Sequence, residues 1–81
     1  MNQHQFLFST IASLENPRQA QRFLEGILTP TELNQVVTRL EIVRRLKNGE
    51  AQHRIAADLR VGVATVTRGS REIKKGNFDN V

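Results

Sequence analysis

The pattern of apolar and polar residues along this 81-residue chain has the period of amphipathic helices, with apolar residues three or four positions apart. A first helix is predicted from Gln5 to about Leu14 on this spacing. A second is predicted from Pro17 to about Glu25, because Asn16 is a good N-cap and Pro suits the first helical position. Gly26 is expected to end it. The apolar residues that define these helices are Phe6, Leu7, Ile11, Leu14, Ala20, Phe23 and Leu24.

The third predicted helix is the longest and has the clearest boundaries. The segment TPTE at Thr29–Glu32 is a capping-box pattern with Pro30 in the first helical position, and Gly49 lies just beyond the last turn. Its apolar stripe consists of Leu33, Val36, Val37, Leu40, Val43 and Leu46, and its last turns carry Arg44, Arg45 and Lys47. The stripe is typical of packing, so this helix is expected to be the spine of the domain or of a dimer. The three basic residues suit the helix dipole and are expected to be surface charges.

The stretch Gln52–Arg71, QHRIAADLRVGVATVTRGSR, has its apolar residues where two short helices cross around a tight turn. We predict helices over about Ala51–Leu59 and Val63–Lys74, which form a helix-turn-helix over residues 51–74. In such a unit the first helix braces the second, whose outer face is free to enter a DNA major groove. The expected inward residues are Ile55, Ala56, Leu59, Val61 and Val66.

The turn inside this unit and the end of the chain carry two further signals. The turn position that usually holds a left-handed Gly is Arg60, which costs about 1 kcal/mol if the backbone is the same. Either the turn differs slightly, or the strain is tolerated for a phosphate contact from Arg60. Gly62 can then cap the following helix. After Gly76, a helix stop, residues 76–81 show no periodicity and are expected to be a frayed tail.

Charge points to the same half of the chain. Residues 1–33 carry two basic and three acidic residues, whereas residues 34–81 carry ten basic and five acidic ones, a balance of +5. A basic excess that coincides with a groove-sized helix favours nucleic acid, and small side chains with Thr hydroxyls at the start of that helix suit close approach to DNA. The candidate DNA-binding residues are Gln52, His53, Arg54, Arg60, Gly62, Val63, Ala64, Thr65, Thr67 and Arg71.

Other classes of function have less support in the sequence. No nucleophile, base and orienting carboxylate share a recognisable spacing, so an enzyme is not expected, and without Cys a metal site is not expected either. The N-terminus lacks the features of a signal peptide or membrane span, so we expect a cytoplasmic protein that does not associate with membranes. A chain this short buries a small core of its own, so a homodimer is expected.

Four segments of the sequence resemble the tryptophan repressor family. They are LTP at Leu28–Pro30, TRLEIV at Thr38–Val43, NGE at Asn48–Glu50 and ATVTRGS at Ala64–Ser70, within a match over about residues 23–75. The resemblance implies an all-α, five-helix Trp-repressor-like domain over residues 1–75, with a C-terminal helix-turn-helix, in an intertwined homodimer. The family's sixth helix has no counterpart here.

The resemblance also implies a site for L-tryptophan as a corepressor, although nothing in the residues themselves requires a cofactor. Arg39 and Arg68 would sandwich the indole ring, and Arg68 would pair with the carboxylate. Glu72 stands where the family has a Ser, and its carboxylate could hold the ligand's ammonium group or pair with Arg68 and close the pocket. The residues implied for this site are Leu28, Thr29, Arg39, Arg68, Gly69 and Glu72.

The DNA-facing residues that the resemblance implies are His53, Gly62, Val63, Ala64, Thr65 and Thr67, to which local chemistry adds Arg54. Either His53 or Arg54 would make the base contact. The expected function is therefore that of a sequence-specific transcription repressor bound to double-stranded DNA at a palindromic operator. The alternative is a small helical protein–protein interaction module of the transcription machinery, which would show an apolar patch on the outer face of its last helix.

Overall fold

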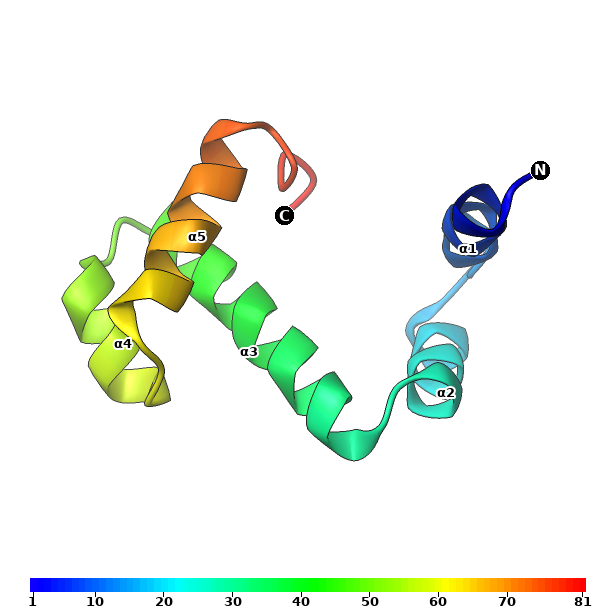
Figure 1. Ribbon diagram of the computed structural model, residues 1–81, viewed down its shortest axis with the longest axis horizontal. Helices are drawn as coiled ribbons and strands as arrows, with labels where there is room; N and C mark the ends of the chain where they lie inside the picture. Colours follow the sequence, from blue (N-terminus) through cyan, green and yellow to red (C-terminus); the bar gives the residue numbers. More distant parts are fainter. The chain divides into compact units, whose positions relative to one another are not determined.

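The computed structural model describes residues 1–81 and is entirely helical apart from turns and connecting segments. Its helices are α1 (Gln3–Ala12), α2 (Pro17–Ile27), α3 (Pro30–Lys47), α4 (Gln52–Leu59) and α5 (Val63–Lys74) (Figure 1). The predicted all-α, five-helix architecture is confirmed. The chain folds as two compact units, Met1–Leu33 and Asn34–Val81. The single domain and the homodimer stay predictions.

The first unit holds α1, α2 and the start of α3. α1 begins earlier than predicted because Asn2 and Gln5 form a capping box, in which each backbone N–H donates to the other's side-chain oxygen, at 3.0 and 2.8 Å. α2 begins at Pro17 with Asn16 as its N-cap, as predicted. The expectation that Gly26 ends α2 is wrong: the helix continues to Ile27, and Leu28 N–H closes the last turn on Leu24 O at 2.9 Å.

The capping box predicted at the start of α3 is present. The amide N–H of Glu32 donates to Thr29 Oγ1 at 3.2 Å, and the amide N–H of Thr29 donates to Glu32 Oε1 at 2.8 Å. The hydrogen bond from the Thr29 backbone holds the pKa of Glu32 below its ordinary value. At the other end, α3 stops at Lys47, and Gly49 follows with a positive φ of 84°. Local sequence signals therefore fix both ends of this helix.

The second unit is built on the C-terminal half of α3, against which α4 and α5 pack (Figure 1). Its buried residues are Ile42, Val43, Ile55, Ala56 and Val66, with Leu46, Leu59 and Val61 partly buried beside them. The predicted inward residues of the helix-turn-helix are thus confirmed. Ile42, which the predicted α3 stripe left out, is only 1% exposed and belongs to the core. In the same stripe Val36, Val37 and Leu40 are exposed at 40%, 58% and 50%.

α5 comes close to α3 at Gly69. A Cβ atom added there would lie 3.1 Å from Ile42 Cγ2 and 3.6 Å from Leu46 Cδ1. Glycine at this position therefore lets the two helices cross with their backbones close together.

The segment after α5, expected to be frayed, forms a run of turns. Gly76 adopts a positive φ of 86°, and the Lys47 ammonium group donates to backbone oxygens of Phe78 and Val81. No helix of the chain combines the length and the apolar character that a bilayer-spanning segment needs. No cluster of three or more His, Cys, Asp or Glu side chains is placed to hold a metal ion.

Candidate nucleic-acid interface

The turn between α4 and α5 has the left-handed conformation usual for a helix-turn-helix, with an arginine in the glycine position. Arg60 has φ 57° and ψ 45°, and the amide N–H of Val61 donates to Ala56 O at 3.1 Å. Of the two alternatives for this turn, the structure adopts the strained one, at a cost of about 1 kcal/mol. The Arg60 side chain is exposed and forms no ion pair.

The N-terminal end of α5 is exposed. Gly62 is its N-cap, so no side chain covers the first backbone amides. Val63, Ala64 and Thr65 are exposed, whereas Val66 is 0% exposed and anchors the helix to the core. Uncapped amides and the helix dipole make such an end attractive to an anion. The structure thus leaves open the part of α5 that was predicted to enter a groove.

Thr67 lies one turn further along α5 and is half-buried. Its hydroxyl donates to the side-chain oxygen of Gln52, the first residue of α4, at 3.0 Å. The hydroxyl proton of Thr67 is therefore already donated to a group of the protein itself. The sequence pattern did not reveal this contact because the two residues are fifteen positions apart and meet only when the helices pack.

Several basic side chains of α4 and α5 have no acidic partners. His53, Arg54 and Arg71 are exposed, and none lies within ion-pair distance of a carboxylate. Of the ten basic residues in the second unit, Arg44, Arg45 and Lys75 are the ones with carboxylate partners. Apart from Lys47, whose ammonium group donates to Phe78 and Val81, the remaining cations are available for phosphate groups.

Arg45, expected to be a surface charge, is instead a brace beneath the helix-turn-helix. Its side chain is 16% exposed, and Nη2 lies 2.7 Å from Glu50 Oε1 and 2.6 Å from Asp58 Oδ2. The guanidinium thus links the end of α3, the following loop and α4. Hydrogen bonds from Arg45 hold the pKa values of both carboxyls below their ordinary values. No pattern along the sequence predicts that Arg45 forms ion pairs with Glu50 and Asp58.

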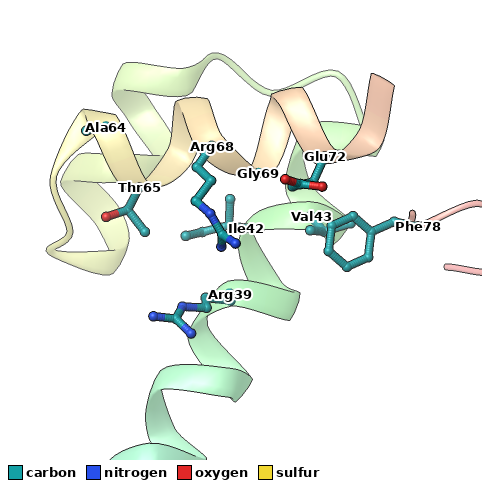
Figure 2. A pocket seen from close by; sticks show the side chains of 9 residues that line it. All are labelled: Arg39, Ile42, Val43, Ala64, Thr65, Arg68, Gly69, Glu72 and Phe78. Carbon is teal, nitrogen blue, oxygen red and sulfur yellow. The ribbon is translucent and has the colours of Figure 1, made fainter. Parts of the chain in front are cut away.

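A pocket of about 280 Å³ lies between α3 and α5 (Figure 2). Figure 2 shows Arg68 extending from α5 toward α3, which carries Arg39, with Ile42 and Val43 on the α3 side. The pocket is lined by Arg39, Ile42, Val43, Ala64, Thr65, Arg68, Gly69, Glu72 and Phe78. It thus brings together four of the six residues implied for a corepressor. The other two lie in the first unit, Leu28 as the C-cap of α2 and Thr29 in the cap of α3.

Glu72 and Phe78 give this pocket features that the sequence did not reveal. The Glu72 carboxylate accepts from Asn77 Nδ2 at 2.5 Å and from Lys75 Nζ at 3.4 Å, and it forms no ion pair with Arg68. The alternative in which Glu72 closes the pocket on Arg68 is therefore not adopted. The hydrogen bond from Asn77 lowers the pKa of Glu72. Phe78 was missed because nothing periodic marks the tail that carries it.

Comparison with known proteins gives a consistent family assignment. The family model described as Trp repressor protein matches residues 2–80. The Trp operon repressor homolog of Vibrio vulnificus (strain YJ016) is 45% identical over 58 residues, which are 70% of this chain and 57% of that protein. The homolog of Vibrio parahaemolyticus serotype O3:K6 (strain RIMD 2210633) is 37% identical over 71 residues, 86% of this chain and 69% of its own length.

A second kind of relative is the uncharacterized protein YerC of Bacillus subtilis (strain 168). It is 32% identical over 71 residues, 88% of this chain and 68% of that protein. The chain thus spans little more than half of the Vibrio vulnificus relative and about two thirds of the other two. No solved structure matches it. The family match over nearly the whole chain, on an all-helical fold, shows that this protein belongs to the Trp repressor family, a family of DNA-binding transcription regulators.

Proposed function

We propose that this chain is a transcription repressor that binds a palindromic operator as a homodimer, with the N-terminal end of α5 in the major groove. The observation that carries the proposal is the exposed, uncapped start of α5, Gly62–Thr65, on a helix whose next residue, Val66, is fully buried. A rigid helix with a free leading end is what groove binding requires. The family membership supports the same function.

The proposed DNA-binding residues divide by the contact they can make. Gly62 and Ala64 let the backbone come close to DNA, and the Val63 and Thr65 methyl groups suit thymine methyl groups. Arg54, Arg60 and Arg71 supply charge for phosphates, and either His53 or Arg54 would reach a base edge. The outer face of α5 offers one large exposed apolar residue, Val63, which favours DNA over a protein partner.

A homodimer would place two such ends on successive major grooves, about 34 to 36 Å apart. The exposed apolar residues of α3, Val36, Val37 and Leu40, support a surface that a second copy of the chain covers. In the first unit, α1 separately exposes Phe6 and Phe8, at 66% and 62%. Two-fold symmetry of the protein then matches two-fold symmetry of the operator.

The pocket between α3 and α5 is proposed to bind L-tryptophan as a corepressor. Its lining suits a ligand with a carboxylate and a flat apolar group, because it combines the guanidinium groups of Arg39 and Arg68 with apolar side chains that include Ile42, Val43 and Phe78. Ala64 and Thr65 line the same pocket and also belong to the proposed DNA-binding end. A ligand there would therefore touch the start of the recognition helix.

Selection of bound DNA from a random pool, with and without L-tryptophan, tests this function. The wild type should enrich a palindrome, and Kd should rise steeply with salt because phosphate neutralisation supplies much of the affinity. Ala64→Glu should abolish binding by placing a carboxylate against the groove, whereas the small Ala64→Ser is the matched control and should bind within a few fold of wild type. Equal binding by the wild type and Ala64→Glu contradicts the groove assignment.

The corepressor part of the same experiment has its own outcome. L-Tryptophan should tighten binding of the wild type, and Arg39→Ala should remove that gain while leaving the ligand-free affinity in place. Identical affinity of the wild type with and without L-tryptophan would show a ligand-independent repressor.

A further inference from the structure

Thr67 is a helical threonine whose hydroxyl bonds outside its own helix. A threonine within a helix commonly donates to the carbonyl four residues earlier, and Thr10 does so in α1, where Oγ1 donates to Phe6 O at 2.7 Å. Thr67 in α5 donates instead to Gln52 Oε1 of α4, at 3.0 Å. Both residues are half-buried, so the hydrogen bond is partly shielded from water. It ties the first residue of the bracing helix to the helix proposed to enter the groove.

The hydrogen bond fixes one half of the Gln52 amide and leaves the other half free. A glutamine side chain offers one carbonyl acceptor and an NH₂ group with two donors. With Oε1 held by Thr67, Nε2 donates to no group of the chain. No buried side-chain nitrogen or oxygen lacks a partner, so Nε2 is open to solvent. Exposed His53 and Arg54 follow it along α4.

We propose that Thr67 is a positioning residue that acts through Gln52, and that the Gln52 NH₂ group donates to a phosphate oxygen or base-edge acceptor of the bound DNA. This inference rests on the proposed function. A free glutamine side chain would have to be ordered on binding, which weakens Kd by roughly two- to tenfold. Because Thr67 already orders the Gln52 amide in the free protein, the entropy cost of ordering it is part of the free energy of folding. It does not reduce the affinity for DNA.

A double-mutant cycle on the DNA sequence selected by the wild type tests this role. Thr67→Val keeps the shape and removes the hydroxyl, and it should raise Kd by roughly two- to tenfold. Thr67→Ser keeps the hydroxyl and should restore wild-type affinity. Gln52→Ala should raise Kd by about tenfold, and Thr67→Val in the Gln52→Ala background should add nothing.

Gln52→Glu distinguishes the role of the amide oxygen from that of the amide NH₂ group. It also tests the proposal if Thr67→Val folds poorly. The glutamate still offers Thr67 an oxygen acceptor, so the melting temperature should stay near that of the wild type. It replaces the outward N–H donors with an anionic oxygen, so Kd should rise at least about tenfold. Wild-type affinity of Gln52→Glu would overturn the proposal.

Two further results would also overturn it. One is an effect of Thr67→Val that is equally large with and without Gln52, because Thr67 would then act independently of the amide. The other is failure of Thr67→Ser to restore affinity. Failure of the proposed function itself looks different: Ala64→Glu would then bind DNA like the wild type. Loss of binding in Ala64→Glu, with wild-type affinity in Thr67→Val and Gln52→Ala, rejects the positioning role alone.

Discussion

At the scale of single residues, a missing methyl group at Gly69 lets α5 cross α3. A Cβ atom there would lie 3.1 Å from Ile42 Cγ2, and Ile42 is only 1% exposed, so it has little room to move. Gly69→Ala gains about 1 kcal/mol of helix propensity, but overpacking a core costs about 1 to 3 kcal/mol. We expect the overpacking to dominate and the melting temperature to fall.

Gly26→Ala is the matched control for this prediction. Gly26 is also helical, but a Cβ atom there would meet no heavy atom within 4 Å. The same substitution should therefore leave stability unchanged or raise it by up to about 1 kcal/mol. Thermal melts of the two variants beside the wild type decide the matter. A Gly69→Ala protein more stable than the wild type would mean that Ile42 yields at low cost.

The sequence was informative about residues whose role is set by near neighbours. Ile55, Ala56 and Val66 were predicted to face inward because their spacing within two short helices leaves little choice. The contact of Thr67 with DNA stays a prediction, and its hydrogen bond to Gln52 was not predicted because this partner lies on another helix. Phe78 entered the pocket without any signal at all. Contacts between elements depend on packing, which periodicity along one element does not describe.

At the scale of elements, the Arg45 brace makes the stability of the helix-turn-helix depend on pH. Arg45 lowers the pKa values of Glu50 and Asp58 from their ordinary values of 4.5 and 3.8. A carboxyl whose pKa is lower in the folded state adds stability above its ordinary pKa and loses it as pH falls through the lowered value. The melting temperature should therefore be constant near neutral pH and fall below about pH 4.5.

Replacement of Arg45 by Met identifies the source of that dependence. Without the guanidinium, both carboxyls return toward their ordinary pKa values, so the variant should melt earlier at pH 7 and lose less stability on acidification. Arg44→Met is the control, because Arg44 is 65% exposed and its pair with Glu41 is a surface pair that contributes little. If the melting temperatures of the wild type and Arg45→Met fall by the same amount between pH 7 and pH 3, Arg45 is not the source of the pH dependence.

Helix boundaries show how far local chemistry determines an element. α5 was predicted with its observed bounds because Gly62 and the apolar pattern mark where it begins and ends. α1 begins two residues before its predicted start at Gln5, because a capping box between Asn2 and Gln5 fixes its N-terminus. α2 passed Gly26 because a glycine in right-handed helical geometry carries only a modest propensity cost. A glycine stops a helix reliably only where the chain turns left-handed, as at Gly49.

At the scale of the whole molecule, one chain alone buries few apolar residues. Five side chains form its buried core, all in the second unit, while Val37 and Leu40 on α3 remain 58% and 50% exposed. Stability of small domains is marginal and depends on apolar burial, so exposed apolar residues at helical spacing favour association. The proposed repressor also needs two recognition helices for a palindrome. We therefore predict that the free protein has twice the mass of one chain in solution.

Leu40→Glu and Val63→Glu form a matched pair for testing this prediction. Both replace exposed aliphatic residues, at 50% and 53%, but Leu40 lies on α3 and Val63 at the proposed DNA-binding end of α5. Burying an unpaired carboxylate costs several kcal/mol, so Leu40→Glu should weaken dimerisation by at least about 100-fold. Val63→Glu should remain dimeric and lose DNA binding. Sedimentation equilibrium measures the masses of both variants and of the wild type. If the wild type is monomeric, or if Leu40→Glu dimerises as strongly as Val63→Glu, the apolar face of α3 is not a dimer interface.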